Sequence, residues 1–282
     1  SAAIWPLWGI ASMTKKKCAL LDTDFISKLH ITRKDDENRL IDRVLELPDY
    51  QFVCHEQIAI ELGRHNAAAN RWLQRKITEG AIQKFSDGDL VALQRRTYGK
   101  NAIAFYLYDL ENACRPFGET YYKQYYAKLE ALRESSDEHF LEELARCDAA
   151  VGRENNLGEI KTYLLQQVLQ SWQDIPLYLF CSDDKKARSS LANVGGIPCI
   201  SAISSFYVLK ERLGIERSEA KLYFDSWMMF HWGMGQTDFK VHRNTKEMQL
   251  IKMDGYEIFN RIYDGAVTIL KNGNLKLRSC DY

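Results

Sequence analysis

Four short apolar runs, each followed by polar residues and then by a helical pattern, constrain the fold of this chain most strongly. The runs lie at 18–21, 51–54, 177–181 and 197–200. Apolar runs of this length that alternate with helical patterns are typical of buried strands in a parallel sheet covered by helices. We therefore expect an α/β fold of three layers with a central parallel sheet of four or five strands.

The segments between and after these runs predict two additions to the sheet. Residues 65–156 are rich in Ala, Arg, Gln, Glu and Tyr and have few turn residues, so we expect a helical insertion there. The chain should then comprise a main domain over 13–232 and a C-terminal β extension over 233–282. A small antiparallel unit is predicted in this extension from three hairpin-type dipeptides, Asp254-Gly255, Asp264-Gly265 and Asn272-Gly273.

The first twelve residues do not fit this α/β pattern. They contain a short apolar stretch that Pro6 and Gly9 interrupt, which is too short to span a bilayer. We expect residues 1–12 to be a leader added to the natural chain, with Met13 as the natural start. The alternative is an arm that docks on a membrane or a partner. We expect no membrane association of the residues after this leader.

Composition limits the classes of partner and the compartment. Lys and Arg total 38 and Asp and Glu total 38, so the net charge is zero. A nucleic acid would therefore have to bind a local basic patch, because the overall field does not attract polyanions. The seven cysteines form no C-x-x-C pair, and several lie in apolar runs, which predicts free thiols and a cytoplasmic protein.

Four acidic residues stand at the ends of strands or near the starts of helices. They are Asp22, Glu61, Glu159 and Asp184. The carboxyl ends of parallel strands share one edge of the sheet, so these side chains should gather there. Carboxylates without His or Cys favour Mg²⁺ or Mn²⁺. No lysine or arginine falls between Cys18 and Ser27 to neutralise Asp22 locally.

Each acid taken alone has a structural explanation. A carboxylate in the first turn of a helix satisfies free N–H groups and opposes the helix dipole, which contributes about 0.3–2 kcal/mol. Capping is the favoured role for Asp22, Asp183 or Asp184 when each is considered separately. For the four acids together, metal binding becomes the favoured role, because carboxylates packed at one edge of the sheet repel each other unless a cation lies between them.

The neighbourhoods of these acids resemble the PIN-domain nucleases. The similar segments are LLDTDFISKL, EQIAIEL, the helix start NLGE, and CSDDKKARSSLANVGGIPCI followed by SSFYVLKERLGI. The resemblance covers about residues 16–64 and 155–228, and it does not explain the insertion or the β extension. It implies a PIN-like fold with Asp22, Glu61, Glu159 and Asp184 as the catalytic acids, Asp183 as a further metal ligand, and Thr23 and Ser182 as supporting residues.

The resemblance also implies an activity. It predicts a Mg²⁺- or Mn²⁺-dependent endoribonuclease that hydrolyses single-stranded or structured RNA, toxin-like or defence-associated, with a protein inhibitor or antitoxin as a partner. Asp22 and Asp184 would bind the metal directly. Glu159 would complete the metal site or orient the water, and Glu61 would act through water. Phosphate contacts are expected from Arg64, Lys185, Lys186 and Arg188, although Arg64 also fits a solvated helix face.

Two other functions are compatible with parts of the sequence. Asp22-Thr23-Asp24 after a strand fits the start of a haloacid-dehalogenase-type phosphatase with Asp22 as the nucleophile, but Glu61 and Glu159 would then have no role. The second alternative is a PIN-like interaction module without turnover, against which the presence of all four acids argues.

Overall fold

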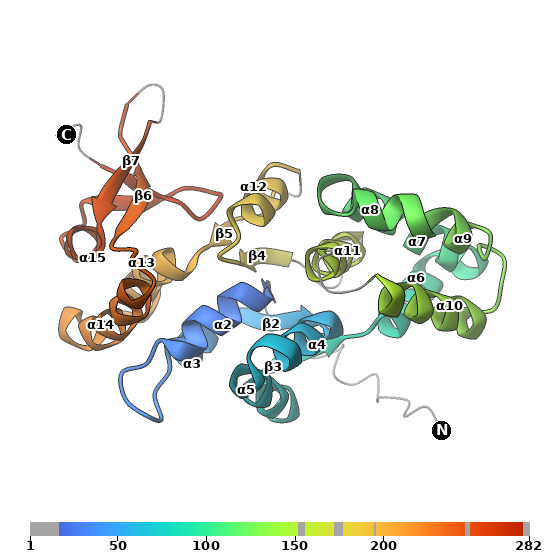
Figure 1. Cartoon of the computed structure of the whole chain (residues 1–282), viewed down its shortest axis with the longest axis horizontal. Coiled ribbons are helices and arrows are strands. Elements are labelled where there is room, and N and C mark those ends of the chain that lie inside the picture. The colour runs from blue at the N-terminus through green and yellow to red at the C-terminus, as the bar shows by residue number, and fades with distance from the viewer. Residues whose placement is uncertain (1–16, 152–155, 172–176, 195, 246–248, 279–282) are drawn as a thin grey trace. The chain divides into compact units, whose positions relative to one another are not determined.

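A five-stranded sheet forms the centre of the computed structural model, with the strand order β3-β2-β1-β4-β5 (Figure 1). The structure describes residues 17–151, 156–171, 177–194, 196–245 and 249–278; the predicted leader lies outside them. The strands are β1 (Lys17–Leu21), β2 (Tyr50–His55), β3 (Ile82–Phe85), β4 (Leu177–Cys181) and β5 (Cys199–Ile200). The α/β fold with a central parallel sheet flanked by helices is confirmed.

The pairing of the strands explains the apolar runs. β1 pairs in parallel with β2, with Ala19 opposite Phe52, and β4 pairs in parallel with β5. The last four residues of β1 are fully buried, as a strand covered on both faces requires. β3 pairs in parallel with β2 inside the segment predicted to be all helical. That prediction is wrong at β3, whose four residues include the part-exposed Gln83 and the exposed Lys84.

The chain divides into two compact units. The first comprises Ser1–Asp22 and Asp49–Tyr178, and the second comprises Thr23–Pro48 and Leu179–Tyr282. The C-terminal β segment therefore belongs to the same unit as the helices that follow β1, β4 and β5.

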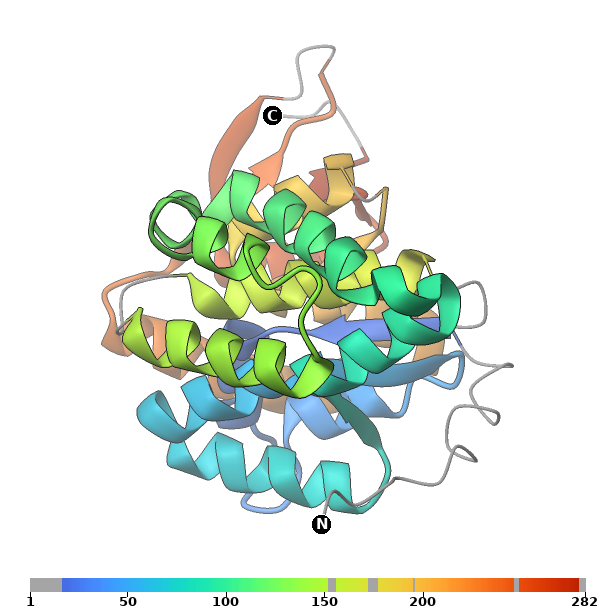
Figure 2. The same cartoon turned by 90° about the vertical axis from the view of Figure 1, so that its right-hand side faces the viewer.

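Helices form most of the first unit (Figure 2). They are α4 (Glu56–His65), α5 (Ala67–Thr78), α6 (Asp87–Tyr98), a 3₁₀ turn (Gly99–Asn101), α7 (Ala102–Phe117), α8 (Glu119–Tyr121), a π-helical turn (Tyr122–Tyr126), α9 (Ala127–Glu130), α10 (Asp137–Ala150) and α11 (Leu157–Ser171). α11 packs against α7, α4 and β2. This helix therefore links the inserted helices to the sheet of its own unit.

A buried cluster of charges holds the inserted helices together. The Lys161 ammonium, on α11, lies 2.9 Å from Asp87 Oδ2 and 2.7 Å from Asp148 Oδ2. Tyr106 donates to Asp87, and Tyr121 donates to Asp148 at 2.8 Å. The cluster thus joins the first residue of α6 to α7, α8, α10 and α11.

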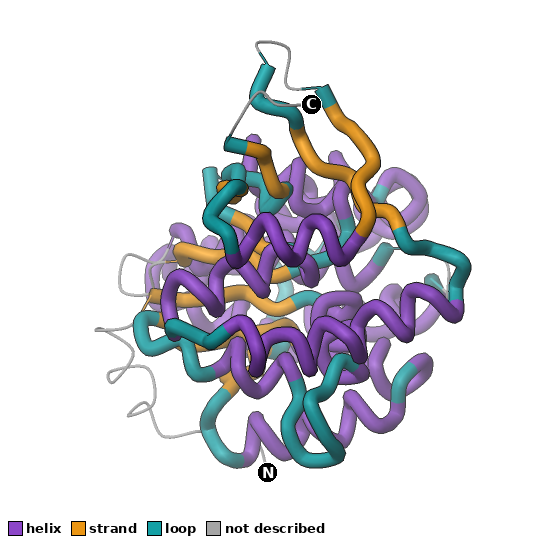
Figure 3. The backbone as a smooth tube through the Cα atoms, turned by 90° about the vertical axis from the view of Figure 1, so that its left-hand side faces the viewer, coloured by secondary structure: helices purple, strands orange, loops and turns teal. Residues whose placement is uncertain are grey.

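The second unit places helices and a small sheet around β4 and β5. Its helices are α2 (Thr23–Ile31), α3 (Leu40–Leu45), α12 (Lys185–Val194), α13 (Ala202–Leu213), α14 (Arg217–Gly233) and α15 (Gly255–Tyr263). Its small sheet has the order β7-β6-β9-β8, from β6 (Asp238–His242), β7 (Leu250–Asp254), β8 (Val267–Ile269) and β9 (Leu275–Leu277) (Figure 3). The sheet is mixed, because β6 and β9 pair in parallel.

Two of the three predicted hairpin dipeptides flank a helix instead. The Asp254 carboxylate accepts hydrogen bonds from the backbone N–H groups of Tyr256 and Glu257, so it caps the start of α15. Asp264 ends the same helix, and Gly265 follows with φ of 73°. Only Asn272-Gly273 forms the expected hairpin loop, between β8 and β9. An Asp-Gly pair fits a helix end as well as a turn, which explains the wrong prediction.

Candidate functional site

Asp22 stands directly after β1, at the carboxyl end of that strand. Asp22 is only 5% exposed, and the four residues before it are fully buried. Ionised carboxylates are seldom buried to this extent without a partner. The position therefore agrees with the predicted placement of this acid at the sheet edge.

Glu61 and the start of α11 lie against each other in the same unit. A Cβ atom built on Gly158 would stand 2.4 and 2.5 Å from the two carboxylate oxygens of Glu61. Gly158 is the second residue of α11, and Glu159 is the third. The structure thus brings the Glu61 carboxylate to the first turn of α11, where free N–H groups and the helix dipole favour an anion.

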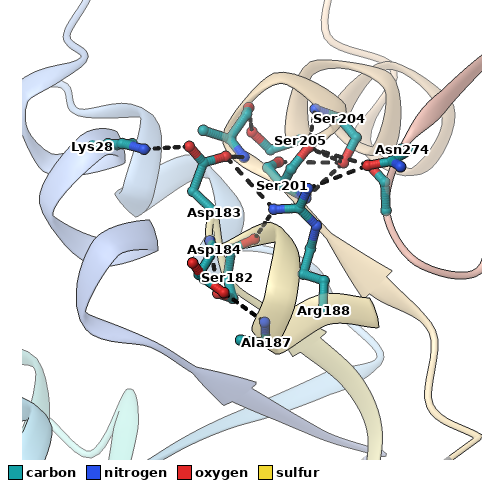
Figure 4. A network of polar contacts seen from close by, with 12 residues as sticks. Lys28, Ser182, Asp183, Asp184, Ala187, Arg188, Ser201, Ser204, Ser205 and Asn274 are labelled. Carbon is teal, nitrogen blue, oxygen red and sulfur yellow. Dashed lines mark hydrogen bonds and ion pairs between the residues drawn. The ribbon is translucent and has the colours of Figure 1, made fainter. Parts of the chain in front are cut away.

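Asp184 has a defined structural role in the second unit (Figure 4). Its Oδ1 accepts a hydrogen bond from the Ala187 N–H at 2.5 Å, so the side chain caps the start of α12. Ser182 supports this turn, because its hydroxyl oxygen accepts from the Asp184 N–H at 3.1 Å. Capping engages one carboxylate oxygen of Asp184 and is compatible with a metal contact through the other.

Asp183 is held by several groups from its own unit (Figure 4). The Lys28 ammonium lies 2.5 Å from its Oδ2, and the Ala202 N–H donates to its Oδ1 at 3.0 Å. Burial acts to raise the pKa of this carboxyl, but Lys28, the Ala202 N–H and Arg188 together lower it from its ordinary value. Asp183 is therefore a carboxylate already neutralised by a lysine.

The remaining predicted residues differ in exposure. Thr23 is the first residue of α2 and is part-exposed. Arg64, Lys185 and Lys186 are exposed, Arg64 in the last turn of α4 and the two lysines at the start of α12. Arg188 is only 6% exposed, and its guanidinium donates to the carbonyl oxygens of Ser182 and Asn272. The three exposed cations are thus better placed than Arg188 for a phosphate.

The carboxylate oxygens near Glu61 and Glu159 limit the kind of metal ion that this region could bind. Among the residues that the structure describes, no three His, Cys, Asp or Glu side chains are arranged to hold a metal ion. Mg²⁺ in proteins is commonly bound through one or two carboxylates, with water and substrate phosphates at its other positions. In the first unit Glu61 and Glu159 offer the oxygen donors for such a site. The residues fit an ion that keeps several waters, and not a cage of three carboxylates.

Lys28 is the residue of this region that the sequence analysis missed. Lys28 stands one residue beyond the stretch from Cys18 to Ser27, which contains no lysine or arginine. The partner of Lys28 is Asp183, 155 residues further along the chain. Only the weak sequence signal of a single lysine on the helix after Asp22 could have pointed to it.

Comparison of the chain with models of protein families, with curated proteins and with solved structures found no match. In the described parts of the chain, no helix is both long enough and apolar enough to cross a membrane.

Proposed function

We propose that this protein is a Mg²⁺- or Mn²⁺-dependent endoribonuclease that hydrolyses phosphodiester bonds in RNA. The observation that carries the proposal is the contact between the Glu61 carboxylate and Gly158, one residue before Glu159. These two acids share a compact unit with Asp22, which is buried at the end of β1. The resemblance of these segments to PIN-domain nucleases supports the same activity.

Glu61 and Glu159 are the two residues that would hold the metal in this proposal, and a direct metal contact of Asp22 stays a prediction. A bound Mg²⁺ or Mn²⁺ would supply a water of lowered pKa and neutralise charge on the phosphate. The chain's own part is to hold Asp22 directly after β1, Glu61 in the middle of α4 and Glu159 in the first turn of α11. A contribution of Asp184 through its second oxygen stays a prediction.

The proposal is tested by incubating the purified chain with end-labelled single-stranded RNA, structured RNA and a phosphomonoester. We expect internal cleavage of RNA with Mg²⁺ or Mn²⁺ and none with EDTA. Hydrolysis of the phosphomonoester without RNA cleavage would instead favour the dehalogenase-type phosphatase. RNA binding without turnover in either metal would favour the interaction module.

Gly158→Ala separates the function of Glu61 from the stability of the fold. The added methyl group must displace the Glu61 carboxylate, which is the mobile end of its side chain. Alanine at this helical position costs the fold little, because Gly to Ala in a helix is favourable by roughly 0.5–1 kcal/mol. We expect RNA cleavage to fall about tenfold or more while the unfolding temperature changes little.

The matched control for this variant is Gly88→Ala. Gly88 is also the second residue of its helix, α6, and a Cβ there meets only ordinary contacts at 3.6 and 3.7 Å. The Gly88→Ala variant should therefore cleave RNA as fast as the wild type. Equal activity of the Gly158→Ala and wild-type chains would exclude Glu61 from the reaction.

A further inference from the structure

The loop between β8 and β9 is hydrogen-bonded to the first residue of β5 and to the residue that follows this strand. The Lys271 carbonyl oxygen accepts from the Cys199 N–H at 2.7 Å, and the Gly273 carbonyl oxygen accepts from the Ser201 hydroxyl at 3.2 Å. Both contacts lie within the second unit. The C-terminal sheet is thus tied by its hairpin loop to the end of β5.

Gly273 makes this close approach possible. Its φ is 80°, and a Cβ there would lie 2.9 Å from the Cys199 carbonyl oxygen and 3.2 Å from Arg188 Cδ. A side chain at this position would be strained and would also collide with backbone. The loop therefore sits directly on β5 and on the stem of Arg188.

Arg188 connects the loop to the acidic turn (Figure 4). Its Nε donates to the Asn272 carbonyl oxygen at 3.0 Å, and its Nη2 donates to Asn274 Oδ1 at 3.2 Å. Its Nη1 donates to the Ser182 carbonyl oxygen at 2.9 Å and lies 4.0 Å from Asp183 Oδ1. A buried guanidinium needs partners for its donors, and these two segments supply them.

The orientation of Asn274 follows from its two neighbours. Arginine only donates hydrogen bonds, so the amide oxygen of Asn274 must face Arg188. The amide nitrogen then lies 3.2 Å from Nε2 of His242, on β6. Asn274 therefore links the small sheet to Arg188 with a defined direction.

We propose that Arg188 and Asn274 are positioning residues, through which the C-terminal sheet fixes the Ser182–Asp184 turn. The sheet would be part of the scaffold of the predicted fourth acid, Asp184, and not a separate binding module. The effect on RNA cleavage rests on the proposed function, whereas the ordering of the turn does not.

The test compares Asn274→Ala with Asn244→Ala by hydrogen exchange and by kinetics. Asn244 lies in the same C-terminal segment and donates to the Arg278 carbonyl oxygen, so it controls for the loss of an amide hydrogen bond away from Arg188. Asn274→Asp keeps an acceptor for Arg188 and serves as the rescue variant. Peptides from α7, in the first unit, report any global unfolding.

We expect Asn274→Ala to speed exchange in peptides covering residues 182–188 roughly tenfold, with α7 unchanged. The kcat for RNA should fall with KM unchanged, and Asn274→Asp should restore both exchange and kcat. Unchanged exchange at 182–188, or equal effects of the Asn244 variant, would overturn the positioning role. Absence of RNA cleavage by the wild-type chain would overturn the proposed function, and the exchange data would still decide the positioning role.

Discussion

Replacing Lys161 by methionine is expected to lower the free energy of unfolding by about 3–5 kcal/mol, because it leaves the part-buried carboxylates of Asp87 and Asp148 without this ammonium group. The Lys161 side chain is 1% exposed, and Asp87 and Asp148 both depend on it. Burial acts to lower the pKa of Lys161, but Asp148 and Asp87 raise it above its ordinary value. Urea unfolding followed by circular dichroism measures the loss.

The control for this prediction is Lys128→Met in the same group of helices. Lys128 lies 2.6 Å from Glu143 Oε2, but its side chain is 58% exposed. An exposed ion pair contributes little to stability, because water screens it, so this variant should unfold close to the wild type. An equal loss of unfolding free energy in the two variants would contradict the prediction that the buried Lys161 contributes more than an exposed lysine.

Asp109→Asn is expected to stabilise the protein in alkaline but not in acidic solution. Burial raises the pKa of Asp109 to about 7, although the Gln94 amide, which donates to it at 2.6 Å, acts to lower it. The unfolded chain ionises this carboxyl near pH 4, whereas the folded chain keeps the proton until about pH 7. Stability from this group is therefore complete below pH 4 and declines as the pH rises to 7.

Asparagine keeps the oxygen that accepts from Gln94 and has no proton to lose. We expect the variant to exceed the wild type by about 2–4 kcal/mol at pH 8 and to equal it near pH 4. Urea unfolding at the two pH values measures this, with the exposed Asp238→Asn as the control. A difference that is the same at both pH values would contradict the prediction.

The fold was predictable where burial is continuous in sequence. The apolar runs at 18–21, 51–54 and 177–181 are strands of the sheet, because strands covered on both faces carry apolar side chains throughout. β3 has only Ile82 and Phe85 as buried residues, so its four residues do not form a continuous apolar run that would predict a strand. The helix α15 was missed because its capping residue, Asp254, also begins a turn-like dipeptide.

The candidate site was predictable only at the level of single elements. The sequence places Asp22 after a strand and Glu159 in the first turn of a helix, since both positions follow from local patterns. The neutralisation of Asp183 by Lys28 and the burial of Arg188 were not predictable. Both depend on contacts between segments that are far apart in the chain, namely α2, α12 and the loop after β8.

The central claim is that Asp22 takes part in metal-dependent cleavage of RNA. The most direct measurement compares kcat/KM for Asp22→Asn and Asp24→Asn, at matched Mg²⁺ or Mn²⁺, with the wild type. Asp24 is exposed in the first turn of α2 and controls for the loss of a nearby negative charge. We predict a loss of at least about a hundredfold for Asp22→Asn and little change for Asp24→Asn. Cleavage that survives Asp22→Asn unchanged would contradict the claim.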